Sequence, residues 1–263
     1  MSAEDGPLPG GTANRGRVIR VGNTVHRPSG GYTPAVHALL GHLADGGFGG
    51  APRVLWAGRR TEVLGYIEGS AATEPLADWA LTAQALASVG ALLRDYHDHA
   101  ASFHGTQLPW QRPVPERWRR SLVTHNDVNP ANVIFRDGRA IALIDFDLAA
   151  PGTAAFDLAV TACFWAPLRA AEDVPDDRRE QRFERFQLLL ASYGADARLR
   201  DEVAEALPEA NRWIADIIAD AALLGHPTFG TLWERDAAMY ERAASWLAAN
   251  DTRLRAAAVQ QDG

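Results

Sequence analysis

The sequence contains no lysine: all 26 residues in the lysine-plus-arginine count are arginine. The simplest cause is a compositional bias that replaces lysine by arginine throughout the chain. The consequence is also chemical, because arginine presents a planar guanidinium where lysine presents a compact point charge. Any site that would hold an anion with a lysine ammonium must therefore use arginine or lose that contact.

Cysteine is nearly absent as well. The single Cys163 excludes a disulfide within the chain and fits a reducing cytoplasm, and its place in the apolar run 158–165 predicts a core residue rather than a nucleophile. No uninterrupted apolar run approaches membrane-spanning length, and residues 1–16 lack the apolar stretch of a signal peptide. We therefore expect a cytoplasmic protein with no membrane partner.

The chain also lacks the Gly-x-x-x-x-Gly-Lys-Ser/Thr motif, which excludes the ordinary P-loop fold. Its formal net charge of −7 argues against a nucleic-acid partner and permits a cationic substrate. With 263 residues, of which 47% are hydrophobic, the chain can bury a sizeable core as one two-lobed unit or two small domains.

The pattern of apolar residues predicts strands first and helices later. Short apolar runs bounded by turn residues predict strands at residues 17–22, 24–27, 52–56 and 62–67. Pro34 opens a stretch of helical spacing over residues 34–44. Further apolar stripes predict helices at residues 81–96, 183–193, 201–206, 211–224 and 231–248.

The central stretch, residues 124–135 (THNDVNPANVIF), is a polar loop that leads into an apolar triplet. An Asp-Gly turn then connects it to a second apolar run ending at Asp145, which predicts strand, turn, strand. This hairpin would carry Asp127 and Asn132 at one end and return the chain to Asp145 at the same end. Two carboxylates and an amide oxygen are hard ligands suited to Mg²⁺.

The pattern His-x-Asp-x-x-x-x-Asn, followed by a hairpin and Asp-Phe, resembles the catalytic and metal-binding loops of the protein-kinase-like superfamily. The 18-residue interval from Asp127 to Asp145 fits that hairpin. The loop is most similar to that of the aminoglycoside phosphotransferase family, with Pro130 two residues before the Asn. Two positions depart from the family pattern: Asn126 replaces the usual Gly, and Asn129 stands where His is common.

The resemblance implies an α+β, two-lobed protein-kinase-like fold. Residues 1–67 would form a small N-lobe, with an antiparallel sheet and one helix that bind the nucleotide. Residues 68–73 would form a hinge, and residues 74–263 a larger, mainly helical C-lobe with the catalytic loop and the substrate site.

The resemblance also implies a reaction: transfer of the γ-phosphoryl group of ATP or GTP to a hydroxyl of a small molecule, with Mg²⁺. By this analogy Asp127 is catalytic and accepts or orients the hydroxyl proton. Asn132 and Asp145 would hold the metal ions that bridge the phosphates.

Three further residues are expected to support these loops. His125 would brace the catalytic loop, with a general base as the less favoured alternative. Asp147 would contact metal or water, or cap the next turn. Asp157, near the start of a helix, would brace the active-site loops, although an acid placed there only by the helix dipole is the simpler alternative.

The missing lysine matters for nucleotide binding, because in this family a strand lysine, paired with a helix Glu, holds the phosphates. Arg27 and Arg20 are the two candidates to replace it. The helix at residues 34–44 contains no acid, so both members of the pair are missing, which is self-consistent. Tyr66 and Ile67, just before the hinge, are expected to contact the nucleotide base.

The acceptor is the least defined part. The family includes aminoglycoside kinases and enzymes for other antibiotics, choline, homoserine or sugars, and the acidic chain favours a cationic antibiotic. Asp216 and Asp220, four apart on one helix face, are candidate substrate contacts; the alternative is a solvated pair.

Two other functions compete with this interpretation. One is a catalytically silent, kinase-like protein that binds a nucleotide or another ligand without the Lys/Glu pair. The other is a metal-dependent phosphohydrolase built on the Asp-Phe-Asp sequence at residues 145–147.

Overall fold

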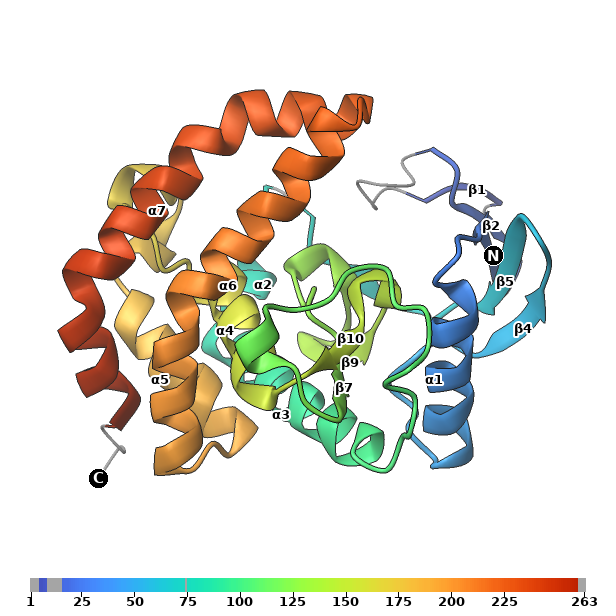
Figure 1. Cartoon of the computed structure of the whole chain (residues 1–263), viewed down its shortest axis with the longest axis horizontal. Coiled ribbons are helices and arrows are strands. Elements are labelled where there is room, and N and C mark those ends of the chain that lie inside the picture. The colour runs from blue at the N-terminus through green and yellow to red at the C-terminus, as the bar shows by residue number, and fades with distance from the viewer. Residues whose placement is uncertain (1–4, 9–15, 74, 260–263) are drawn as a thin grey trace.

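The computed structural model describes residues 5–8, 16–73 and 75–259, and it has a β-rich N-terminal part beside a larger helical part (Figure 1). The predicted α+β class, with a small antiparallel N-lobe and a mainly helical C-lobe, is confirmed. Within the described ranges, none of the helices combines the length and apolar character needed to cross a membrane.

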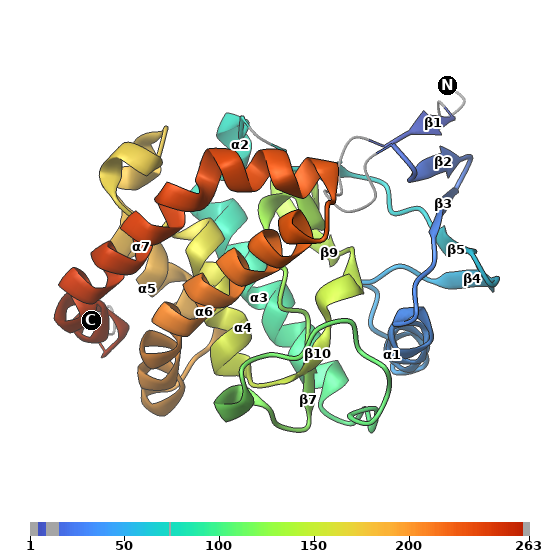
Figure 2. The same ribbon diagram turned by 45° about the horizontal axis from the view of Figure 1, so that its top comes forward.

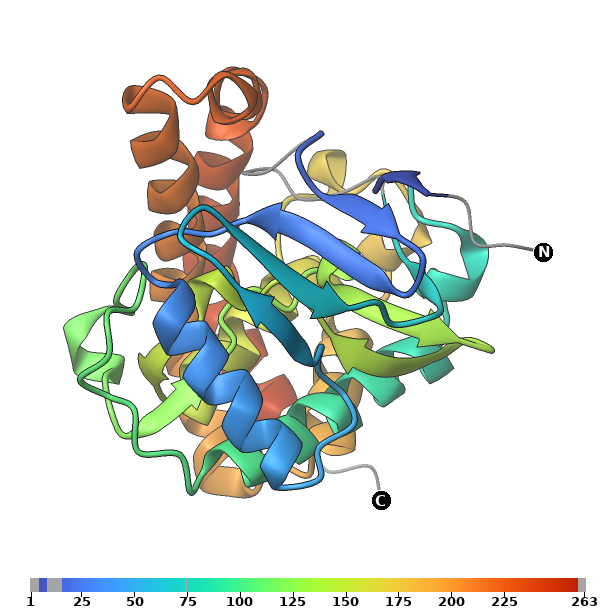
Figure 3. The same ribbon diagram turned by 90° about the vertical axis from the view of Figure 1, so that its right-hand side faces the viewer.

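The N-lobe is an antiparallel five-stranded sheet with the strand order β1-β2-β3-β5-β4 (Figure 3). Its strands are β1 (Gly6–Pro7), β2 (Ile19–Val21), β3 (Thr24–Pro28), β4 (Val54–Ala57) and β5 (Thr61–Gly65). The register of β3 against β5 sets Arg27 directly opposite Glu62. Helix α1 (Thr33–Asp45) has a Pro in its first turn and buries Leu39, Leu40 and Leu43.

Two small sheets hold the central loops. Strand β6 (Ser70–Ala71), inside the predicted hinge, pairs with β8 (Val133–Arg136), which pairs with β9 (Arg139–Leu143). Strand β7 (Leu122–Thr124) pairs with β10 (Ala150–Gly152). The predicted strand-turn-strand is confirmed, because β8 and β9 form an antiparallel hairpin whose turn residues Asp137 and Gly138 both have positive φ.

Helices make up most of the C-lobe. They are α2 (Asp78–Leu81), α3 (Ala83–Ala100), α4 (Ala154–Trp165), α5 (Arg182–Tyr193), α6 (Ala197–Leu223) and α7 (Pro227–Val259). Short 3₁₀ segments lie at Glu116–Trp118, Pro130–Asn132, Phe146–Leu148, Ala171–Asp173 and Asp177–Arg179. Helix α3 lies at the centre and buries Leu86, Val89, Leu93 and Tyr96, while α6 and α7 run side by side (Figure 2).

The prediction of separate helices at residues 201–206 and 211–224 is wrong, because both belong to α6. Pro208 lies inside this helix but on its exposed side, where the helix continues without the proline N–H bond. The buried stripe continues on either side, through Leu207 and Ala210, so packing outweighs the local cost of the proline. Helix α7 likewise extends beyond its predicted end and buries Leu254 and Ala258.

Helices α3 and α5 pack closely at Gly90. A Cβ at this position would lie 2.9 Å from the Leu189 carbonyl oxygen and 2.1 Å from Ser192 Oγ. We therefore expect Gly90→Ala to push the two helices apart and lower the free energy of unfolding by about 1–3 kcal/mol in urea melts.

The matched control is Gly41→Ala in helix α1, where a Cβ meets nothing within 4 Å. This variant should be neutral or more stable by up to about 1 kcal/mol, because alanine favours helix more than glycine does. Equal stability of the two variants would contradict the packing described for α3 and α5.

Candidate active site

The loop after β7 turns sharply at Asn126, whose φ of 61° lies in the left-handed region. Asn tolerates this conformation better than most residues, which explains physically how it can stand at the usual glycine position. Its side chain is fixed on both sides: Asn126 Oδ1 accepts from the Thr124 hydroxyl (2.8 Å), and Nδ2 donates to the Leu148 carbonyl (3.1 Å). The turn therefore ties the loop that carries Asp127 to the loop that follows Asp145.

Asp157 is fully buried in the first turn of α4, which Thr153 caps. Its carboxylate accepts hydrogen bonds from the backbone N–H groups of His125 and Asn126, both at 2.8 Å, and from His97 Nε2 at 2.9 Å. Burial alone would raise the pKa of Asp157, but the His97 hydrogen bond and the neighbouring imidazoles lower it below its usual value. The carboxylate thus holds the start of the loop that carries Asp127.

His125 is completely buried, and burial lowers the pKa of its imidazole to about 4. The neutral ring accepts from the Asp127 backbone N–H at Nδ1 (3.2 Å), and Nε2 bonds the Ile144 carbonyl (3.1 Å). The ring also packs on Phe146, with centroids 4.5 Å apart. These contacts join the Asp127 and Asp145 loops, and they occupy both ring nitrogens.

The carboxylate of Asp127 is held by two amides. Asn129 Nδ2 donates to Oδ1 (2.8 Å), and Asn132 Nδ2 donates to Oδ2 (2.7 Å). Burial raises the pKa of Asp127 to about 8, with the nearby Asp145 and Asp147 carboxylates adding to the increase and the two amides opposing it. A cation bound nearby would favour the carboxylate form.

Arg27 on β3 reaches across to the C-lobe loops. Its Nε donates to Glu62 (2.8 Å), Nη1 to Asp145 (2.9 Å) and Nη2 to Asp147 (2.8 Å). Burial alone would lower its pKa, but the three carboxylates raise it above the ordinary value. Asp147 also accepts from the Tyr32 hydroxyl (2.7 Å), so in the described structure it is a partner of Arg27 and Tyr32 rather than a turn cap.

The strand lysine and the helix Glu are both absent, and the structure instead has a buried ion pair on two adjacent strands. The pair is rebuilt as Arg27 with Glu62, which is 1% exposed and lies on strand β5 instead of the helix. Helix α1 contributes His37, whose Nε2 lies 2.5 Å from Glu62. Two adjacent strands can supply the pair because Arg27 and Glu62 are directly opposed in the sheet.

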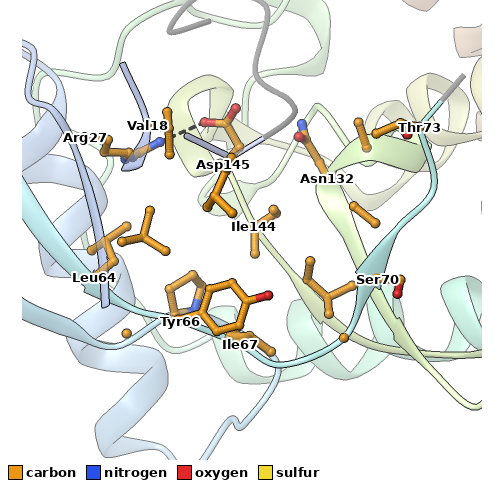
Figure 4. Close-up of a pocket in the computed structure, with 18 residues that line it drawn as sticks. Val18, Arg27, Leu64, Tyr66, Ile67, Ser70, Thr73, Asn132, Ile144 and Asp145 are labelled. Carbon is orange, nitrogen blue, oxygen red and sulfur yellow. Dashed lines mark hydrogen bonds and ion pairs between the residues drawn. The ribbon is translucent and has the colours of Figure 1, made fainter. Parts of the chain in front are cut away.

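A cavity of about 370 Å³ lies between the lobes next to Arg27 (Figure 4). Tyr66 and Ile67 line it, as do Asn132 and Asp145. The Tyr66 backbone N–H already donates to the Asn23 carbonyl (2.9 Å), so Tyr66 would meet a base through other atoms. Arg20 instead stacks on the Tyr66 ring at 3.6 Å, away from the carboxylates that Arg27 contacts.

The residues present fit Mg²⁺ bound together with a nucleotide. Asn132 donates from Nδ2 to Asp127, which leaves its Oδ1 as a ligand, and Asp145 supplies a carboxylate beside it. No group of three or more His, Cys, Asp or Glu suited to a metal occurs among the residues that the structure describes. Mg²⁺ commonly takes one or two protein oxygens and completes its shell with phosphates and water, so this donor set is sufficient.

A second cavity, of about 540 Å³, extends from Asp127 to helices α6 and α7. Asn132 and Asp145 line both cavities, so the two meet at these residues. Of the predicted acceptor contacts, Asp220 lines the second cavity but is paired with Arg112 at 2.8 Å. Asp216 is exposed and is absent from the lining.

Several residues of this site carry no role that sequence patterns predict. Glu62 pairs with Arg27, and the Tyr32 hydroxyl donates to Asp147. Asn129 donates to Asp127, and His97 bonds the Asp157 carboxylate. Only Asn129 carried a local signal, since it lies inside the motif. The other three come from distant elements, and their place depends on strand register and helix packing.

Solved structures share this architecture. The chain superimposes on a choline/ethanolamine kinase family protein from Mesorhizobium loti with a TM-score of 0.62 at 14% identity, covering 98% of this chain and 92% of the other. A GDP complex of aminoglycoside 2′-phosphotransferase-IIIa gives a TM-score of 0.59 at 13% identity, covering 96% and 94%. The fold is therefore protein-kinase-like, as predicted.

The family follows from sequence. Residues 106–187 match the family model described as APH, phosphotransferase enzyme family. The trifolitoxin immunity protein of Rhizobium leguminosarum bv. trifolii is 30% identical over 272 residues, covering 95% of this chain and 97% of that protein. The chain belongs to the APH phosphotransferase family, a group of kinase-type enzymes.

Asp157→Asn should destabilise the protein by about 2–3 kcal/mol at pH 7, because an amide cannot accept all three buried donors. Since the native pKa is depressed, the carboxylate contribution is complete above the ordinary Asp pKa of about 4 and is lost as the pH falls through the native value. The stability gap between wild type and variant should therefore be constant from pH 5 to 8 (roughly) and narrow in more acidic solution.

Denaturant melts across this pH range measure the gap. Asp98→Asn is the control, because Asp98 is exposed and pairs with Arg94 on the surface of α3. Its effect should stay below about 1 kcal/mol. A gap that does not change in acid would show that Asp157 stabilises the loop by shape rather than by charge.

Arg27→Met should lower the free energy of unfolding by about 3–5 kcal/mol, because Glu62 would stay buried without its guanidinium partner. Adding Glu62→Met should recover part of this loss, since two apolar side chains replace two buried charges while Asp145 and Asp147 still lack their guanidinium partner. Thermal and urea melts of both single variants and the double variant measure the coupling. Additive effects would mean that the pair contributes no mutual stabilisation.

Proposed function

We propose that the protein transfers the γ-phosphoryl group of ATP or GTP to a hydroxyl of a small molecule, with Mg²⁺. The observation that carries this proposal is the meeting of two cavities at Asn132 and Asp145, with Asp127 lining the second. A nucleotide in the first cavity would direct its phosphates toward an acceptor in the second. The protein needs to supply little covalent chemistry, because positioning and charge stabilisation provide most of the catalysis of phosphoryl transfer.

Each proposed role follows from the contacts. Asp127, fixed by Asn129 and Asn132, would orient the acceptor hydroxyl and take its proton. Asn132 and Asp145 would hold Mg²⁺, which when bound offsets the negative charge of the phosphates. His125 and Asp157 would keep the loop in place.

Arg27 is the proposed phosphate ligand in place of lysine. It lines the nucleotide cavity, and its guanidinium can hold phosphate oxygens through more than one nitrogen. Glu62 on its other side would keep it oriented, the task that the helix Glu performs for the usual lysine. By analogy with the protein-kinase-like fold, the proposed N-lobe is residues 1–67, the hinge is residues 68–73 and the C-lobe is residues 74–263.

The biological role that we propose is resistance to a toxic small molecule by phosphorylation, in the cytoplasm where ATP is available. The support is the 30% identical relative, whose name assigns it immunity to trifolitoxin. A catalytically silent binding protein is less well supported, because the Asp127, Asn132 and Asp145 set is intact and the lysine has a charged replacement. A phosphohydrolase built on both Asp145 and Asp147 is less well supported for a different reason, since the Asp147 carboxylate is taken up by Arg27 and the Tyr32 hydroxyl.

Asp127→Ala should abolish acceptor-dependent ATP consumption while thermal stabilisation by Mg-ATP persists, because the variant loses the proton acceptor and keeps the nucleotide cavity. Asp145→Ala should instead weaken the stabilisation by Mg-ATP. The control is Asp137→Asn at the exposed far turn of the β8–β9 hairpin, which should behave as wild type. Retention of most activity by Asp127→Ala would refute the catalytic assignment.

A further inference from the structure

The second cavity has a polar floor and an apolar roof. The floor is formed by the loops that carry Asp127 and Asp145, and the roof by the α6–α7 helix pair, which lies across the C-lobe from them (Figure 1). The roof side chains are apolar and only half-buried or exposed: Ile217, Ile218, Leu224, Phe229 and Leu232. Apolar groups that line a cavity beside a proposed catalytic carboxylate are suited to the body of a substrate.

Three of the four carboxylates that line this cavity are engaged by an arginine. Arg112 pairs with Asp220 at its edge, and Arg27 pairs with both Asp145 and Asp147 on its floor. Among the described lining residues, Asp127 is thus the carboxylate held by amides rather than by an arginine. An acceptor with several ammonium groups would find one carboxylate without an arginine partner here, and would lose hydration against the apolar roof.

Resting on the proposed phosphotransfer, we propose that the acceptor is an uncharged or singly charged molecule whose hydroxyl projects from an apolar body. Its apolar face would remove the roof from water, which favours binding, while the hydroxyl reaches Asp127. The hydroxyl oxygen would bond to the γ-phosphorus as the bond from that phosphorus to the bridging oxygen breaks. The proton would pass to Asp127, and the products are a phosphate monoester and a nucleoside diphosphate.

The test compares two groups of hydroxyl-bearing acceptors in one assay of nucleoside diphosphate release with Mg-ATP. The apolar-bodied group is chloramphenicol, clindamycin and erythromycin, and the polycationic group is gentamicin and streptomycin. Acceptor-dependent, saturable release is expected with at least one member of the first group and with neither member of the second. Thermal stabilisation by Mg-ATP alone is measured in parallel.

Ile217→Asn tests the roof directly, because Ile217 lines the cavity and its substitution puts an amide there. We expect KM for the accepted compound to rise about tenfold with little change in kcat, the scale of effect produced by altering an apolar pocket contact. Leu224→Asn, at an 88% exposed lining position, gives a second variant that should fold normally. The matched control is Leu223→Asn, 86% exposed and outside the lining, which should leave KM unchanged.

The outcomes separate the two claims. Turnover of gentamicin or streptomycin, or no turnover of any apolar-bodied compound despite stabilisation by Mg-ATP, would overturn the acceptor class and leave the nucleotide site standing. An unchanged KM in both Ile217→Asn and Leu224→Asn would also overturn it. No stabilisation by Mg-ATP would overturn the proposed function itself, and this inference with it.

Discussion

One buried guanidinium joins the two lobes at the site. Arg27 belongs to the N-lobe sheet, yet two of its three nitrogens bond the C-lobe carboxylates Asp145 and Asp147, and the third bonds Glu62. A lysine ammonium, a single nitrogen, could not present this planar fork to three separate carboxylates. The absence of lysine therefore has a structural counterpart: the cluster is built for arginine, with Glu62 and His37 completing it from the next strand and from α1.

A second buried charge, Asp157, organises the other half of the site. It takes the backbone N–H groups of His125 and Asn126, while neutral His125 links the Asp127 loop to Ile144. The two arrangements share a principle: a buried charge is tolerable only when its hydrogen-bonding capacity is satisfied, and satisfying it fixes the loops around it. The α6–α7 pair adds the apolar roof of the second cavity, which faces the polar loops that carry Asp127 and Asp145.

Sequence patterns predicted the fold class, the β8–β9 hairpin and the loops that meet beside Asp127, because all of these depend on local spacing. They did not predict Glu62 as the partner of Arg27, since that depends on the register between β3 and β5. They also divided α6 at Pro208, where tertiary packing outweighs a local signal. Asp220 was a reasonable acceptor contact by sequence, but Arg112, more than a hundred residues away in the chain, already pairs with it.

The measurement that tests the account most directly is phosphorus NMR of the protein with Mg-ATP and the acceptor compounds. The account predicts ADP and one new phosphate monoester in equal amounts, formed only when an acceptor is present. ADP with inorganic phosphate alone would indicate hydrolysis, and unchanged ATP would indicate a protein that does not catalyse the transfer; either result would contradict phosphotransfer at Asp127.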